Sequence, residues 1–139
     1  MTQQELSEDQ PIMELTVEEC WDLLSGAEIG RLAYRLVDEI HLVPINYTVE
    51  DRSILFRTAA GNKLLAAELE SEVAFEIDWV GEDSAWSVLA RGHLRHLDEA
   101  EEERLSALRE HPWVPSLKYD HVELTPAVVT GRRFLLRRT

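Results

Sequence analysis

Four residues around one short loop carry the chemistry that this sequence suggests most directly. Arg57 and Thr58 end an apolar run, and Asn62 and Lys63 follow Gly61. A lysine in the first turn of a helix is electrostatically unfavourable, because the helix N-terminus already carries partial positive charge. A bound phosphate would remove that conflict, since the exposed N–H groups also favour an anion there. The spacing therefore predicts an anion-binding loop.

The segment after this loop is expected to be a helix from Lys63 to Glu70, with Asn62 as its N-cap. The alternative interpretation is a surface loop with two solvated cations, which is the commoner role of such residues. The whole chain has a formal net charge of −13. A local cluster of positive charge is less expected as background in such a chain, and this favours the anion site.

Composition limits the class of protein. The 139 residues are enough for one domain with a single core. The net charge of −13 argues against nucleic acid or an anionic membrane as a partner. No apolar run approaches membrane-spanning length, and the polar, acidic start differs from a signal peptide. Cys20 is the single cysteine, so an intramolecular disulfide is impossible and a cytoplasmic location is expected. Residues 1–11 are expected to be disordered, and residues 12–139 to form one domain.

Apolar and polar residues alternate over most of the chain, which is typical of strands. Before the first of them, Thr16 and Glu19 form a capping box for a helix that ends at Gly26. A second helix over residues 98–110 is expected to be capped by Asp98. The predicted strands are residues 29–36, 40–49, 53–58, 73–80, 85–97, 122–124 and 128–136, with a break at Thr125-Pro126 between the last two. Mostly antiparallel strands with few helices predict a mainly β fold, a β-barrel with helical decorations.

Single residues within these strands give further expectations. Pro44 lies in mid-strand, where it predicts an edge, a bulge or backbone that faces a ligand. Trp79 is expected in the core, whereas for Trp86 core and ligand contact are equally favoured. Cys20 is expected on the buried face of its helix. The five histidines show no metal-ligand spacing, so no metal site is predicted.

The ordered set of motifs VPINY, FRT, GNK, WSVLARG and VTGRR resembles the flavin-binding split β-barrel family. The most similar branch is the pyridoxamine 5′-phosphate oxidase-like proteins of actinobacteria. The resemblance runs from about Leu15 onward. It implies an FMN-binding split barrel that holds its cofactor at the interface of a homodimer, with a deazaflavin as the alternative cofactor.

The resemblance also assigns residues to the cofactor. In the strand VPINY the residues that would line the flavin ring, mostly through backbone groups, are Pro44, Ile45, Asn46 and Tyr47. The flavin and its phosphate side would be contacted by Arg57 and Thr58. The phosphate would be bound at the helix start by the pair Asn62 and Lys63. Further flavin contacts fall on Trp86 and Ser87.

Two functions are open at this point. The first is a flavin-dependent oxidoreductase acting on a small organic molecule, and the second is a non-catalytic flavin- or ligand-binding protein. True pyridoxamine phosphate oxidases have C-terminal motifs with arginine and tryptophan that hold the substrate phosphate, and this chain has no tryptophan after Trp113. Efficient oxidation of pyridoxamine phosphate is therefore not expected. The flavin carries the redox chemistry in such sites, so no catalytic side chain can be named.

Overall fold

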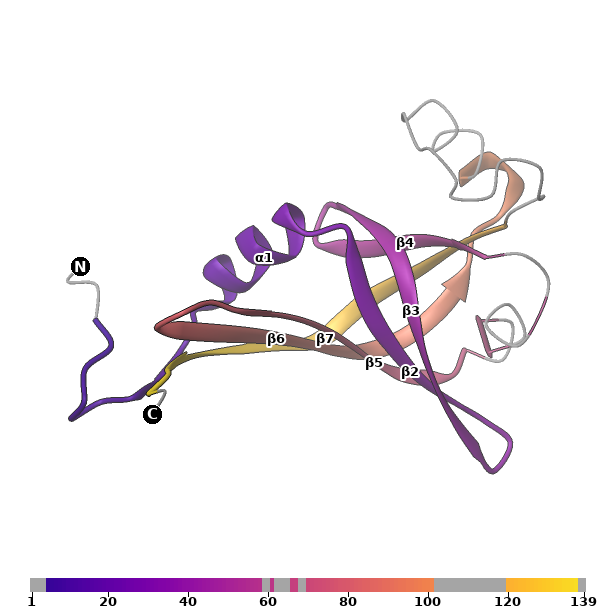
Figure 1. The fold of residues 1–139 in the computed structure, drawn as a ribbon. Coiled ribbons are helices and arrows are strands. Elements are labelled where there is room, and N and C mark those ends of the chain that lie inside the picture. Colours follow the sequence, from indigo (N-terminus) through magenta and orange to yellow (C-terminus); the bar gives the residue numbers. More distant parts are fainter. Residues whose placement is uncertain (1–4, 59–60, 62–65, 68–69, 102–119, 138–139) are drawn as a thin grey trace.

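The chain folds into one antiparallel sheet that curls around and closes on itself beside a short helix (Figure 1). The structure, a computed structural model, describes residues 5–58, 61, 66–67, 70–101 and 120–137. In these residues the named elements are β1 (Ile12–Glu14), α1 (Val17–Gly26), β2 (Ile29–Leu36), β3 (Glu39–Glu50), β4 (Ser53–Thr58), β5 (Glu72–Val80), β6 (Ser84–His96) and β7 (Asp120–Leu135).

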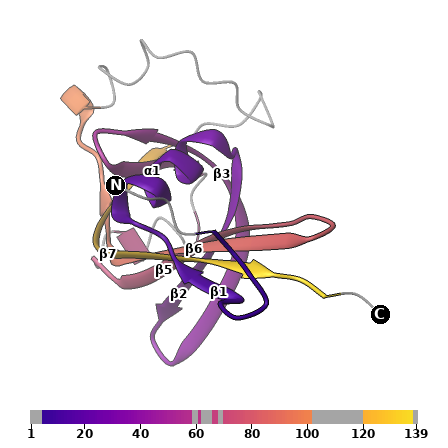
Figure 2. The same ribbon diagram turned by 90° about the vertical axis from the view of Figure 1, so that its left-hand side faces the viewer.

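The barrel closes through β7, the last strand. The strand order is β1-β7-β4-β3-β2-β5-β6, and β6 also pairs with β7. The start of β7 pairs with β4 and its end pairs with β1, while β6 follows almost its whole length on the other edge. The β5–β6 hairpin and the end of β7 extend away from the closed part of the barrel (Figures 1 and 2). This confirms the predicted β-barrel.

The predicted strands agree closely with the observed ones. The bounds of β2 and β4 are those expected, and β3, β5 and β6 differ by one residue at their ends. The inner face is apolar, because alternate residues of each strand point inward. The core contains, among others, Leu32, Ile45, Tyr47, Phe56, Phe75, Ile77, Val88, Leu94 and Leu124.

Helix α1 begins at the predicted capping box. The Thr16 side chain accepts a hydrogen bond from the Glu19 N–H at 3.1 Å, and the Glu19 carboxylate accepts one from the Thr16 N–H at 3.0 Å. The hydrogen bonds from Thr16 lower the pKa of Glu19. The helix buries Cys20, as predicted, and burial raises the pKa of its thiol. The described residues include no helix that is long and apolar enough to cross a membrane.

The prediction of a break at Thr125-Pro126 was wrong, because β7 runs through both residues. The register with β6 shifts there: Arg91 pairs with Val128 and Gly92 with Pro126, so Ala127 is an extra residue. Such a bulge accommodates a proline that cannot donate to the ladder. The strand bends at this point instead of ending.

The prediction that Trp79 lies in the core was also wrong. Its side chain is 49% exposed, although it has the same parity along β5 as the buried Phe75 and Ile77. Pairing of β5 with β2 ends at Glu76, so the inner face at Trp79 lies beyond the closed barrel. The indole covers Gly81 instead, where an added Cβ would lie 2.3 Å from the ring.

Two predicted helices fall largely outside the described residues. Asp98 and Glu101 form the expected cap, with the Glu101 N–H donating to Asp98 Oδ1 at 2.8 Å and the Asp98 N–H to Glu101 Oε1 at 3.2 Å. The rest of that helix lies outside the description. Of the helix expected from Lys63 to Glu70, the description includes the helical, buried Ala66 and Ala67, and Glu70.

Candidate functional site

Strands β3 and β4 stop pairing with each other next to the predicted cofactor residues. Their ladder runs from Glu50 and Ser53 to Tyr47 and Phe56 and ends there. Strand β3 continues beyond this point with β2 as its partner. We call the region beyond the last pair, formed by residues 44–47 of β3 and 57–58 of β4, the β3–β4 opening.

Some backbone N–H and C=O groups of β3 point toward this opening, because their direction alternates along the strand. The Tyr47 N–H donates to the Glu28 carbonyl at 3.0 Å, on the β2 side. Because backbone direction alternates along a strand, Asn46 and Pro44 direct their backbone groups to the other edge, beyond the end of the β4 ladder. Pro44 therefore costs no bond to β2, and the predicted edge position for this residue is confirmed.

Side chains around the opening divide into two sets. Pro44 and Asn46 lie on the outer face of β3, since Ile45 and Tyr47 between and beside them are buried in the core. Arg57 lies on the outer face of β4 and directly follows Phe56, the last residue of β4 that pairs with β3. Thr58 is buried, with 4% of its surface exposed. The outer edge therefore offers an amide, a guanidinium group and backbone polar groups, whereas Ile45, Tyr47 and Thr58 could meet a ligand only through their backbone.

The Tyr47 side chain has a structural partner instead. Its hydroxyl donates a hydrogen bond of 2.6 Å to the Leu24 carbonyl, one of the carbonyls that the end of α1 leaves without a helical partner. Its ring packs edge-on against Phe75, with ring centroids 4.8 Å apart. Burial raises the pKa of Tyr47 to about 12. Tyr47 thus fastens β3 to α1.

This contact gives a testable prediction. Replacing Tyr47 with Phe leaves the buried Leu24 carbonyl without its donor, so we expect a loss of about 1–2 kcal/mol in the free energy of unfolding. Tyr34→Phe is the control, because the buried Tyr34 hydroxyl makes no hydrogen bond within the described chain. Urea unfolding of both variants measures the difference, and equal losses would contradict the assignment.

The Tyr47 phenol also makes the free energy of unfolding depend on pH. The folded-state pKa of about 12 lies above the value near 10 of an exposed tyrosine. The neutral phenol therefore favours the folded state, and its contribution is present below pH 10 and is lost as the pH rises through 12.

The two predicted cofactor residues on β6 lie elsewhere. Ser87 is on the outer face, where it pairs with Asp78 and Arg132, and Trp86 packs partly against the core. From Asn46 the sheet crosses β2 and β5 before it reaches Ser87, which is about 14 Å at the usual strand spacing. The structure therefore brings together Pro44, Asn46 and Arg57, but not Trp86 and Ser87. Asn62 and Lys63 lie outside the described residues.

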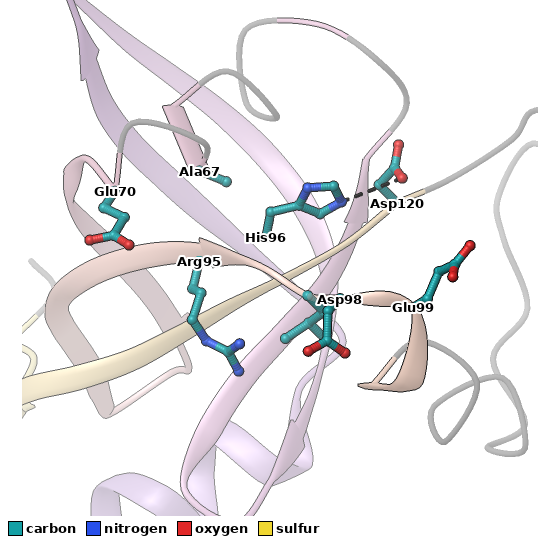
Figure 3. A pocket seen from close by; sticks show the side chains of 8 residues that line it. Ala67, Glu70, Arg95, His96, Asp98, Glu99 and Asp120 are labelled. Carbon is teal, nitrogen blue, oxygen red and sulfur yellow. Dashed lines mark ion pairs between the residues drawn. The ribbon is translucent and has the colours of Figure 1, made fainter.

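A cavity of about 460 Å³ lies beside the end of β4 (Figure 3). Thr58 pairs with Asp120, which lines it, and His96 lies 3.4 Å from the Asp120 carboxylate. Its other lining residues are Ala67, Glu70, Arg95, Leu97, Asp98 and Glu99. Among the described residues that line this cavity, carboxylates outnumber cations, and these residues alone do not favour a phosphate.

The Arg95 guanidinium does not change that balance, because it is already neutralised. It donates to Glu101 at 2.6 and 2.8 Å and to Glu123 at 3.0 Å. The hydrogen bonds from Arg95 are the main reason that the pKa of Glu101 falls to about 2. Within the described part of the chain, no group of three His, Cys, Asp or Glu side chains is placed to hold a metal ion.

Several known proteins are similar to this chain in fold or in sequence. A provisionally assigned pyridoxamine 5′-phosphate oxidase of Corynebacterium glutamicum is 35% identical, with a TM-score of 0.83, over 96% of this chain and 100% of that one. An FAD-binding protein of Mycobacterium smegmatis is 37% identical, with a TM-score of 0.74, over 88% of this chain and 98% of its own. An uncharacterized protein of Mycobacterium tuberculosis is 38% identical over 90 residues, which are 62% of this chain and 79% of that protein.

The family comparison covers most of the barrel. The family model described as pyridoxamine 5′-phosphate oxidase matches residues 16–133, which include α1, β2–β6 and most of β7. The match and the two structures above agree with the resemblance expected from the motifs. The chain belongs to the pyridoxamine 5′-phosphate oxidase family.

Proposed function

We propose that the protein binds a flavin, FMN, at the β3–β4 opening and acts as a flavin-dependent oxidoreductase on a small organic molecule. The observation that carries the proposal is the outer edge itself: backbone groups of Pro44 and Asn46 lie beside the outward Arg57 in a chain of net charge −13. A flavin ring needs hydrogen-bonding groups along one edge, and its phosphate needs a cation. The residues present fit both needs.

Each part of the chain has a defined task in this proposal. Asn46 and the backbone of Pro44 would orient the ring, and Arg57 would hold the phosphate, together with Asn62 and Lys63 of the loop. The bound flavin supplies the electron or hydride transfer, and the protein supplies orientation and electrostatics. The similarity to the FAD-binding protein of Mycobacterium smegmatis supports a flavin. FAD contains the FMN unit, so the same contacts would hold either nucleotide.

Equilibrium titration of the purified protein with FMN, FAD and riboflavin, followed by flavin fluorescence, tests the proposal. We expect saturable binding of FMN, and weaker binding of riboflavin because it lacks the phosphate. The absence of saturable binding by folded protein would refute it. An 8-hydroxy-5-deazaflavin added to the same series tests the alternative cofactor, and flavin reduction by a reduced nicotinamide separates an enzyme from a non-catalytic carrier.

We further propose that the protein is a homodimer. The outer face around the opening carries Ile29, Ile40 and Leu42, which are 50%, 70% and 68% exposed. A contiguous apolar patch of this kind is uncommon on a monomer. A second copy seated on this face would cover the patch. It would also bring another Trp86 and Ser87 within reach of the opening from which they lie distant in one chain.

Sedimentation equilibrium tests the dimer. We expect twice the chain mass of 16.0 kDa at micromolar concentration. Leu42→Lys should shift the equilibrium toward monomer. Val80→Lys is the matched control, because Val80 is 64% exposed but lies at the β5–β6 hairpin. A monomer mass for the unmodified protein with FMN present would refute the dimer.

We expect little turnover of pyridoxamine 5′-phosphate. That reaction needs the substrate phosphate held firmly, because remote binding energy positions the reacting carbon. Arg132 is exposed on the outer face, the neighbouring Arg133 points to the other face, and Arg137 is paired with Glu8. An assay of pyridoxal phosphate production with FMN-loaded protein should give a catalytic efficiency below about 10⁴ M⁻¹s⁻¹. A higher value would refute this prediction.

A further inference from the structure

The outer face of the barrel carries opposite charges on two neighbouring strands. On β2 the charged side chains of this face are Arg31 and Arg35. On β5, which pairs with β2, they are the carboxylates Glu72, Glu76 and Asp78. The outer face of β2 is therefore cationic along its length, and that of β5 is anionic.

Some of these charges are paired within the chain and others are not. Arg31 donates to Glu76 at 2.9 Å and to Asp78 at 3.1 Å. Arg35 and Glu72, which lie just beyond the other end of the β2–β5 pairing, make no ion pair or hydrogen bond with any residue that the structure describes. A cation and a carboxylate thus remain for another molecule that packs on this face.

Two small side chains lie between the paired and the unpaired charges. Ala33 of β2 is directly opposite Ala74 of β5, and both lie on the outer face. They belong to the lining of a hollow of about 580 Å³. Leu42 of β3 is opposite Ala33 on its other side, so the hollow is continuous with the apolar patch of the proposed homodimer. Small side chains at this point let the face of a second sheet approach closely.

The charges decide how a second copy can lie on this face. Two copies that stack face to face are related by a two-fold axis between them, which runs either across the strands or along them. An axis across the strands lays each strand over its own copy, so cations meet cations on β2 and carboxylates meet carboxylates on β5. An axis along the strands, above the Ala33–Ala74 pair, lays β2 of each copy over β5 of the other. Opposite charges then face each other, which favours this axis.

The register of the sheet shows which residues this axis brings together. Positions that are neighbours across β2 and β5 in one chain face each other between the two chains. Ala33 therefore lies over the partner's Ala74, and Arg35 lies over the partner's Glu72. The two residues without a partner in one chain are complementary to each other across the interface.

A second observation supports the same axis. Asn46 pairs with Ile29 of β2, and Ser87 pairs with Asp78 of β5, so both stand at the same height along the sheet. Their strands, β3 and β6, lie at equal distance from the axis on its two sides. The axis therefore places Ser87 of the partner subunit opposite Asn46, at the β3–β4 opening.

We propose that the two chains of the dimer pack with β2 of each over β5 of the other, and that Arg35 of each chain forms an ion pair with the partner's Glu72. This inference rests on the homodimer proposed above and not on flavin binding. Each ion pair occurs twice, because a two-fold interface repeats every contact. The partner also covers the hollow over Ala33 and Ala74.

Sedimentation equilibrium of flavin-free chains with reversed charges tests this arrangement. Arg35→Glu places a carboxylate against the partner's Glu72, and Glu72→Arg places two arginines together, twice in each dimer. Each variant should raise the dissociation constant of the dimer by at least about 100-fold, because each of the two like-charge contacts costs about tenfold or more. A circular dichroism spectrum checks that both variants fold.

An equimolar mixture of the two variants is the decisive sample. In a mixed dimer residue 35 of each chain faces a residue 72 of opposite charge, whereas within each chain these two positions carry like charges. The mixture should therefore dimerise within about tenfold of the unmodified protein, which an ion pair inside one chain could not explain. Arg52→Glu and Glu82→Arg make the same changes of charge at exposed turn positions and should dimerise like the unmodified protein.

The outcomes separate this arrangement from the dimer itself. A monomer mass for the unmodified protein would refute the dimer and the arrangement together. A dimer that tolerates either reversal, a mixture no better than its two components, or an equal loss in the control variants would refute the arrangement alone.

Discussion

Arg57→Ala is expected to weaken FMN binding about 10- to 100-fold while leaving the fold stable. A hydrogen bond to a charged group contributes about 1.5–3 kcal/mol, which corresponds to that change in affinity. Arg57 lies on the outer face of β4 and not among the inward core residues. Removing its side chain therefore takes away a cation and little buried apolar surface. Lys63→Ala, in the adjoining loop, should have an effect of similar size.

Two comparisons make this experiment specific. Arg52→Ala removes a different arginine, which is exposed in the turn before β4 and pairs with Glu18 at 3.7 Å. It should not change FMN affinity. Riboflavin affinity should be nearly the same for the unmodified protein and for Arg57→Ala, because the phosphate that Arg57 would hold is absent. If Arg57→Ala binds FMN as tightly as the unmodified protein, the phosphate is held elsewhere and the assignment of the opening is wrong.

Gly30→Ala is expected to destabilise the protein by about 3 kcal/mol, at the upper end of the usual cost of overpacking. A Cβ at this position would lie 2.1 Å from Phe75 Cζ and 2.5 Å from Phe75 Cε2. Phe75 is completely buried and packs edge-on against Tyr47, so its ring cannot withdraw without disturbing the contact between β3 and α1. The melting temperature should fall by roughly 10 °C.

Gly26→Ala is the control for this variant. Nothing lies within 4 Å of a Cβ added at Gly26, at the end of α1, so its melting temperature should change little. Adding Phe75→Leu to Gly30→Ala relieves the clash, and the two changes should cost less together than the sum of their separate costs. Additive costs would show that the Cβ of residue 30 does not act through Phe75.

The sequence predicted the strands well because alternation is a local property. Residues of β2 alternate between buried and more exposed positions along the strand, and the bounds predicted for β2 and β4 were correct. Alternation also predicted an inward direction for Trp79, but it contains no information about where the barrel stops being closed. That boundary depends on the pairing of β5 with β2, which ends at Glu76. The run of β7 through Pro126 likewise depends on a bulge opposite Gly92, a non-local feature.

The candidate sites differ in how far the sequence could reveal them. Asn46 and Arg57 could be predicted as candidates because both lie in short motifs of one hairpin, and the register of that hairpin follows from its turn. The cavity beside the end of β4 was not predicted, because its described lining comes from segments far apart in the sequence, such as Ala67, Arg95 and Asp120.

Closure of the barrel by β7 has a consequence for the order of folding on the ribosome. Strands β4 and β6 have β7 as their partner on one edge, and β1 pairs with it as well, Ile12 opposite Phe134. Until residues 120–135 leave the exit tunnel, two long strand edges have unpaired N–H and C=O groups, the kind of edge that recruits other chains. These contacts are also distant in sequence, which slows folding. Nascent chains that lack β7 are therefore the form most in need of a chaperone, and the final strand commits the chain to its native state.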